Sequence, residues 1–210
     1  MKLTLTQESK TQILLGLFVS LVIGMNLLGG KIIPFLGLST SVAIFMVPLT
    51  FLITDIVEET FGKKVANQFI AVGVISILVI LAFTLLFVAL PPASRYDANE
   101  AYRTVLGQSA RIMTASLIAF VVSQYHDVWA FNFWKQRTGG RFLWLRNNFS
   151  TIVSQAIDTL LFMFIAFYHI TPKFTALYIL SIAIPYYLLK ISFAVLDTPF
   201  VYLGVRWLKR

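Results

Sequence analysis

Six long apolar stretches fill nearly the whole 210-residue chain, and each is close to the ~20 residues that a helix needs to cross a bilayer. They cover residues 11–30, 38–57, 66–90, 109–134, 149–170 and 176–203. Charged residues make up only 12% of the chain, about half the share of a soluble domain. The sequence therefore predicts an all-α polytopic membrane protein with six transmembrane helices, forming a single domain over residues 1–210.

The ends of these stretches carry recognisable helix-breaking signals. Pro91-Pro92 is predicted to end the third span, and Gly139-Gly140 to break the helix that follows the fourth. Pro48 is predicted to kink or break the second span. No small-x-small cleavage site follows the first stretch, so we interpret it as a retained span and not a signal peptide.

The net charge of +8 follows from membrane topology. With six spans, the two termini, the second-to-third loop and the fourth-to-fifth loop share one side, and they hold most of the lysine and arginine residues. The positive-inside rule then places both termini in the cytoplasm, in a multi-pass protein of the cell (inner) membrane. Nucleic-acid binding is a poor alternative because the basic residues are scattered over short loops.

Four ionisable residues lie inside or at the ends of the apolar stretches: Asp55, Arg111, Asp158 and Lys190. A charge at the bilayer centre costs at least ~2.5–3.5 kcal/mol and rarely persists there without a partner or a function. Asp55 and Asp158 could pair with Arg111 or Lys190 merely to hold helices together. We favour a functional role for Asp158, Lys190 and Asp55, whereas Arg111 could equally be a snorkelling anchor.

Polar and aromatic residues line one face of several predicted helices. At about 100° per residue, Thr151, Gln155, Asp158 and Phe162 share a face, as do Tyr186, Lys190 and Asp197. Such faces are costly in lipid, so we expect them to converge on a common interior. Carboxylates, amides and aromatic rings together suit a planar, hydrogen-bonding heterocycle such as a purine-like base, although sugars or amino acids could use the same groups.

Enzyme and cofactor motifs are missing from the sequence. There is no H-E-x-x-H, G-x-S-x-G or Walker pattern, and the chain has no cysteine. We therefore expect neither catalysis nor a cofactor.

An ordered set of short motifs runs along nearly the whole chain. It comprises Asn26, Phe51-Leu52-Ile53-Thr54-Asp55, Arg111-x4-Ser116, Gln124-x2-Asp127, Leu143-Trp144-Leu145-Arg146-Asn147, Gln155-x2-Asp158-Thr159 and Lys190 before Asp197-Thr198-Pro199. In this set the chain resembles the queuosine precursor transporter family, small six-helix membrane proteins also described as vitamin-uptake-like.

The resemblance implies import of a 7-deazaguanine, such as preQ0, preQ1 or queuine, for salvage into tRNA. It also implies a fold similar to the substrate-binding subunits of energy-coupling-factor transporters. The substrate-binding residues expected on this basis are Asn26, Phe51, Asp55, Arg111, Gln124, Asp127, Gln155, Asp158 and Lys190.

Several functional alternatives remain open from the sequence. The chain could work alone, as a homodimer, or as the binding subunit of an importer with a separate ATP-driven module. It could also be a non-transporting membrane scaffold whose buried polar groups only join helices. The carboxylates alone would fit a proton-coupled channel or exchanger of inorganic ions.

Overall fold

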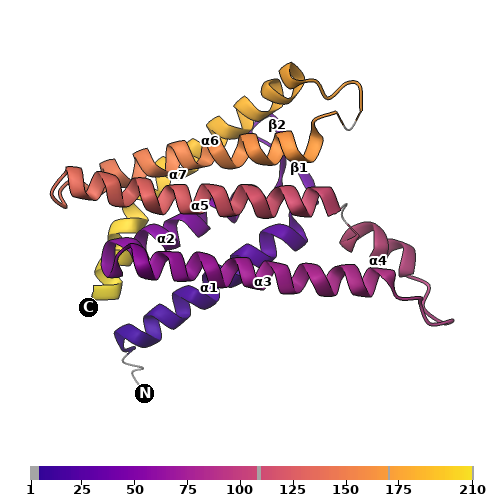
Figure 1. Cartoon of the computed structure of the whole chain (residues 1–210), viewed down its shortest axis with the longest axis horizontal. Coiled ribbons are helices and arrows are strands. Elements are labelled where there is room, and N and C mark those ends of the chain that lie inside the picture. The colour runs from indigo at the N-terminus through magenta and orange to yellow at the C-terminus, as the bar shows by residue number, and fades with distance from the viewer. Residues whose placement is uncertain (1–4, 108–109, 170, 210) are drawn as a thin grey trace.

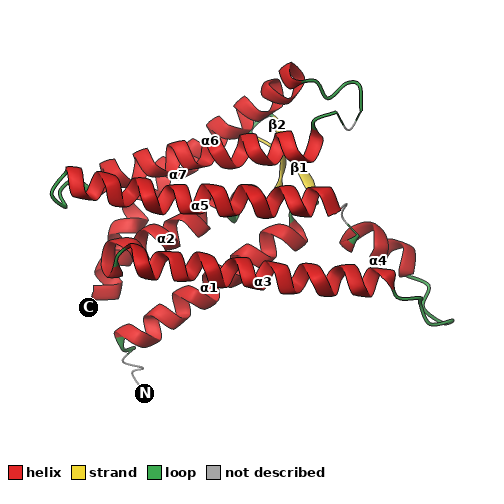
Figure 2. Cartoon of the chain, viewed as in Figure 1, coloured by secondary structure: helices red, strands yellow, loops and turns green. Residues whose placement is uncertain are grey.

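The computed structural model describes residues 5–107, 110–169 and 171–209, without the side chains of residues 110–113. These residues form a helical bundle with one small β-hairpin (Figures 1 and 2). The elements are α1 (Gln7–Leu28), β1 (Ile32–Phe35), β2 (Leu38–Ser41), the 3₁₀ helix η1 (Val42–Phe45), α2 (Val47–Phe61), α3 (Lys63–Ala89), α4 (Asn99–Leu106), α5 (Ala110–Arg137), α6 (Leu143–Phe167) and α7 (Ala176–Lys209).

Four of the described helices, α1, α3, α6 and α7, are long and apolar enough to cross a membrane. They correspond to the predicted spans 11–30, 66–90, 149–170 and 176–203. Helix α5 has 28 residues and matches the predicted span 109–134, but it is less apolar because Ser123, Gln124, His126 and Asp127 interrupt it. Its polar side chains pack inside the bundle, where Gln124 and Asp127 are fully buried.

The prediction of a transmembrane helix over 38–57, kinked or broken at Pro48, is wrong for residues 38–45, which form β2 and η1. The chain turns at Leu36-Gly37, both with positive φ, and pairs β1 with β2 in antiparallel register before η1 and α2 begin. Pro48 lies in the first turn of α2, where its missing N–H is not needed, so it starts this helix and does not kink it. At 15 residues, α2 spans only ~22 Å, less than the ~30 Å hydrocarbon core.

The predicted helix ends are confirmed elsewhere. Helix α3 stops at Ala89, before Pro91-Pro92, and α5 stops at Arg137, before Gly139 and Gly140, which both adopt positive φ. The segment that follows Pro91-Pro92 contains the short helix α4.

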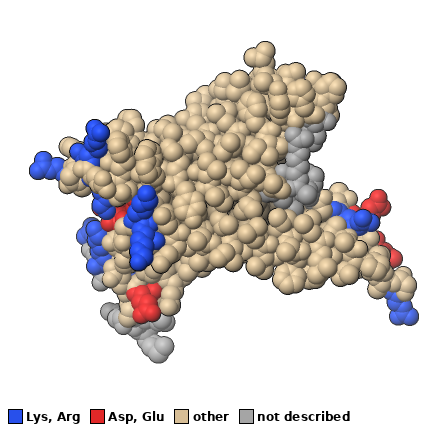
Figure 3. Space-filling model, viewed as in Figure 1, with Lys and Arg blue, Asp and Glu red and all other residues tan. Residues whose placement is uncertain are grey.

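The described chain ends, the α2–α3 junction and the α5–α6 turn lie at one end of the bundle (Figure 1). On the face shown in Figure 3, the larger group of lysine and arginine lies at this end, a smaller group mixed with acidic residues lies at the opposite end, and the middle carries no charged side chain. There Glu59 of α2 forms salt bridges with Lys135 of α5 and with the buried Arg146 of α6. The guanidinium of Arg146 also donates hydrogen bonds to the carbonyls of Gly140 and Arg141. These contacts and the two salt bridges connect α2, α5 and α6 at this end of the bundle.

The hydrophobic core joins α1, α2, α3, α5 and α7, and Leu143 at the start of α6 also belongs to it. Close approach of α2 and α7 depends on Gly204, because a Cβ at this position would lie 2.3 Å from Cδ1 and 2.9 Å from Cγ1 of the buried Ile56. Real carbon atoms do not approach so closely, so any side chain at position 204 forces these helices apart or Ile56 out of its rotamer.

This packing predicts that Gly204→Ala lowers the free energy of unfolding by about 1–3 kcal/mol, despite the better helix propensity of alanine. Thermal unfolding of the purified protein in detergent measures the effect. Gly16→Ala is the matched control, since no atom lies within 4 Å of a Cβ there. Adding Ile56→Val, which removes the closest atom, should recover part of the loss; a Gly204→Ala protein as stable as the control would refute the close contact.

Candidate functional site

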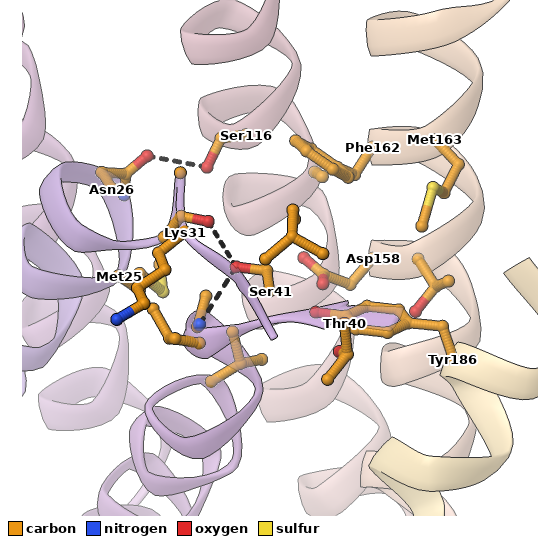
Figure 4. Close-up of a pocket in the computed structure, with 18 of the residues that line it drawn as sticks. Met25, Asn26, Lys31, Thr40, Ser41, Ser116, Asp158, Phe162, Met163 and Tyr186 are labelled. Atoms are coloured by element: carbon orange, nitrogen blue, oxygen red, sulfur yellow. Dashed lines mark hydrogen bonds between the residues drawn. The ribbon is translucent and has the colours of Figure 1, made fainter. Parts of the chain in front are cut away.

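The structure contains a cavity of about 1260 Å³, part of whose wall is shown in Figure 4. Its lining includes the β-hairpin and α4, which lie away from the end that holds the described chain termini (Figure 1). Its walls come from the end of α1, the β-hairpin, the start of α2, and from α4, α5, α6 and α7. Four predicted site residues line it: Asn26, Phe51, Asp158 and Lys190. The convergence of polar helical faces on one interior is thus partly confirmed.

The charged centre of the cavity is the ion pair between Asp158 of α6 and Lys190 of α7. Lys190 Nζ lies 2.6 Å from Asp158 Oδ2, and Nζ also lies 5.1 Å from the centre of the Tyr186 ring. Ser123 donates a hydrogen bond to Asp158 Oδ1 at 3.3 Å. The Lys190 side chain is only 2% exposed, whereas that of Asp158 is 16% exposed, so the carboxylate is the partner more open to a ligand.

Other polar groups in the cavity wall are available for hydrogen bonds. The hydroxyls of Thr40 and Thr159 are buried and have no hydrogen-bond partner. On the opposite side, Asn26 Oδ1 accepts a hydrogen bond of 2.8 Å from Ser116, as Figure 4 shows. Buried polar groups without partners are rare in native proteins, so the two threonine hydroxyls mark places where a ligand or water is expected to bind.

Aromatic side chains supply flat walls beside these polar groups. Phe51 of α2, Phe120 of α5, Phe162 of α6 and Tyr186 of α7 all line the cavity. In Figure 4 Phe162 and Tyr186 lie on either side of Asp158. Aromatic faces next to a carboxylate and an ammonium group can hold a planar ring by stacking while its edge makes hydrogen bonds.

Gln124, a predicted substrate contact, lies behind the cavity wall. Its Nε2 donates to Thr50 Oγ1 at 3.1 Å, and its Oε1 accepts from Thr54 Oγ1 at 3.3 Å. Since Thr50 itself lines the cavity, Gln124 joins α5 to α2 and holds this part of the wall in place.

Asp55, Asp127 and Gln155 also lie outside the cavity lining. Asp55 Oδ2 accepts a hydrogen bond of 3.4 Å from Thr151, and Asp55 interacts electrostatically with the fully buried Asp127. Gln155 is fully buried, and neither its Nε2 nor its Oε1 has a hydrogen-bond partner. These three residues therefore do not line the cavity beside Asp158 and Lys190.

Arg111 lies at the start of α5, but its side chain is outside the described part of the chain, and its predicted role stays a prediction. Tyr186 lines the cavity but is not among the predicted substrate-binding residues, although the sequence places it on the same helical face as Lys190. Sequence reasoning also missed Thr40, because nothing in the apolar stretch 38–57 indicates a hairpin that folds back over the cavity.

Among the described residues, no group of three or more His, Cys, Asp or Glu side chains could hold a metal ion. The arrangement fits reversible binding of a small polar ligand with a flat ring.

Comparisons with known proteins find one family and two named relatives. The family described as "Putative vitamin uptake transporter" matches residues 41–204. The chain is 33% identical over 193 residues to the "Probable queuosine precursor transporter" of Bacillus subtilis (strain 168), covering 90% of this chain and 82% of the relative. It is 32% identical over 192 residues to the "Queuosine precursor transporter" of Escherichia coli (strain K12), covering 90% and 84%. No solved structure matches.

The unequal exposure of the Asp158–Lys190 pair predicts unequal effects on stability. Asp158→Asn leaves the deeply buried Lys190 without its counter-charge and should cost about 3–5 kcal/mol of unfolding free energy. Lys190→Met should cost less, because the remaining carboxylate faces the cavity. The double variant should be more stable than Asp158→Asn alone in thermal unfolding. Equal stability of both single variants and the unsubstituted protein would contradict a buried, mutually dependent pair.

Proposed function

Because the chain belongs to the "Putative vitamin uptake transporter" family and its relatives are named queuosine precursor transporters, we propose that it imports a queuosine precursor, a 7-deazaguanine such as preQ0, preQ1 or queuine, for salvage into tRNA. The family is one of transporters and not of enzymes. The substrate is a small molecule that crosses the membrane without chemical change.

The observation that carries the proposal is the Asp158–Lys190 pair opening on an aromatic cavity. A 7-deazaguanine has a ring N–H beside an exocyclic amine, and this edge donates two parallel hydrogen bonds that a carboxylate can accept. Asp158 takes this edge, and the Lys190 ammonium donates to the ring carbonyl. Phe51 or Phe162 stacks on the ring, and Thr40 and Thr159 reach its remaining polar atoms.

The cavity volume suits the larger members of this substrate class. At about 1260 Å³ it exceeds the ~300–1000 Å³ of pockets for drug-sized ligands, so the substituted queuine fits as readily as preQ0 or preQ1. Asn26 and Ser116 lie on the opposite wall and contact the substituent at the 7-position of the ring.

In the proposed topology, the chain crosses the cell membrane six times and both termini lie in the cytoplasm. Helix α5 provides the fourth crossing with its polar face inward, and the hairpin, η1 and α2 together provide the second. The clustering of lysine and arginine at the end that holds the described termini supports this orientation (Figure 3). The cavity then extends toward the outside, and the Glu59 cluster lies at the cytoplasmic end.

A binding subunit that needs a separate ATP-driven module is the second candidate, favoured by the expected likeness to energy-coupling-factor subunits. Uptake of a deazaguanine into proteoliposomes that contain only this chain, as a monomer or homodimer, excludes an obligatory module. No uptake without added ATP-driven subunits favours it.

Import predicts a phenotype in cells that cannot make the precursor themselves. Such cells, given an external deazaguanine, should contain queuosine-modified tRNA only when this protein is present. Asp158→Asn should abolish or strongly reduce the modified tRNA, whereas Asp97→Asn, a matched change in an exposed loop, should not.

The amount of folded protein in the membrane must be measured for each variant. A scaffold role predicts that Asp158→Asn lowers the amount of folded protein but not the uptake per folded molecule. Normal queuosine salvage in cells that lack this protein would overturn the proposed function.

A further inference from the structure

A second and much smaller cavity, of about 10 Å³, lies where α2, α6 and α7 meet. This volume is close to the minimum that holds one water-sized particle. Four of its wall residues carry side-chain oxygens: Asp55 of α2, Asn147 and Thr151 of α6, and Asp197 of α7. None of these four lines the large cavity.

Two of these oxygens are buried and unpaired. Asp55 is 2% exposed, and while Thr151 donates a hydrogen bond to its Oδ2, its Oδ1 has no partner. Asn147 is also 2% exposed, and its Oδ1 accepts no hydrogen bond. An amide oxygen held beside carboxylates in the wall of a small cavity is a hard ligand for a cation.

The charge around this cavity is negative. The groups that act electrostatically on Asp55 are Asp127 of α5 and Glu58 of the same helix, both buried, and Asp197 shares the cavity wall with it. The salt bridges between described side chains join Lys135 and Arg146 to Glu59, and Lys190 to Asp158. Asp55, Glu58, Asp127 and Asp197 take no part in these pairs. Lys135 and Lys63 act favourably on Glu58, but no cation of the described residues acts on Asp55, whose carboxyl faces that of Asp127 within hydrogen-bonding reach.

Among the described side chains Asp55 has no cationic partner, and a buried carboxylate is costly unless it takes up a proton or binds a cation. We propose that the small cavity bounded by Asp55, Asn147, Thr151 and Asp197 binds a monovalent cation, either sodium or hydronium. Multivalent metals usually take more carboxylate ligands, and only two line this cavity.

The cation site is linked to the large cavity through Phe51, which lines both. A cation in the small site fixes Asp55, four residues along α2 from Phe51, and thereby the wall against which a ligand stacks. Resting on the proposed function, cation and deazaguanine therefore strengthen each other's binding by the same factor, as linkage requires. A cation gradient could then drive uptake.

The test uses the purified full-length protein without any deazaguanine, so it does not depend on the proposed function. The midpoint of thermal unfolding is measured at constant ionic strength while sodium replaces potassium, and separately in potassium while the pH is lowered. Sodium binding should raise the midpoint by several degrees in a saturable manner, since a ligand that binds only the folded state stabilises it. Hydronium binding should give no sodium effect but a rise on acidification.

Variants assign the response to the site. Asn147→Leu should abolish the sodium effect, and Asn147→Asp, which keeps the oxygen, should retain it. Asn148→Leu, on the same helix but outside the cavity wall, is the matched control and should also retain it. In the hydronium case, Asp197→Asn should abolish the rise on acidification.

Three results would overturn the proposal: no response to sodium or acid, an equal response in all variants, or a saturable response to calcium or magnesium alone. If the protein binds sodium here but binds no deazaguanine, the cation site is supported and the proposed function is refuted. If the protein binds a deazaguanine but shows no cation response, the proposed function is supported and the cation site is refuted.

Discussion

The high cost of burying charge in an apolar bundle governs the arrangement of this protein. Each ionisable group inside must meet a counter-charge, hydrogen bonds or a bound ligand. Lys190 and Asp158 meet this requirement by pairing at 2.6 Å across α6 and α7, and Glu59 meets it by joining Lys135 and Arg146. The large cavity lies beside the first pair, which therefore both joins two helices and presents a carboxylate to a ligand.

Phe51 lies between two polar regions, whose residues the sequence motifs assign to a single site. On one side Asp158, Lys190 and Tyr186 face the large cavity; on the other, Asp55 faces the small one. Gln124 stands behind the wall, tied to Thr50 and Thr54. Under the two proposals, the acidic residues have different tasks: Asp158 recognises a ring edge, and Asp55 helps to hold a cation.

Much of this architecture could be predicted from the sequence because lipid demands long apolar helices with polar groups turned inward. Helices α1, α3, α6 and α7, and the breaks at Pro91-Pro92 and Gly139-Gly140, follow from length and backbone chemistry alone. The prediction of a transmembrane helix over 38–57 failed because an apolar composition is equally compatible with a hairpin, a 3₁₀ turn and a shorter helix.

The site was harder to predict than the fold. Helical periodicity places Asp158 and Lys190 on inward faces, but it cannot tell a cavity wall from the layer behind it. Gln124 and Gln155 share such faces and yet lie away from the cavity lining, since their depth depends on how neighbouring helices pack. Thr40 enters the site only through the hairpin, a contact that no local pattern encodes.

The central claim is that the cavity beside Asp158 and Lys190 holds the deazaguanine ring. An experimental structure of the protein with a bound deazaguanine tests it most directly. If the proposed function is correct, ligand density lies against the Asp158 carboxylate, with the ring stacked on Phe51 or Phe162. Density at another location, with the Asp158–Lys190 pair untouched, would contradict it.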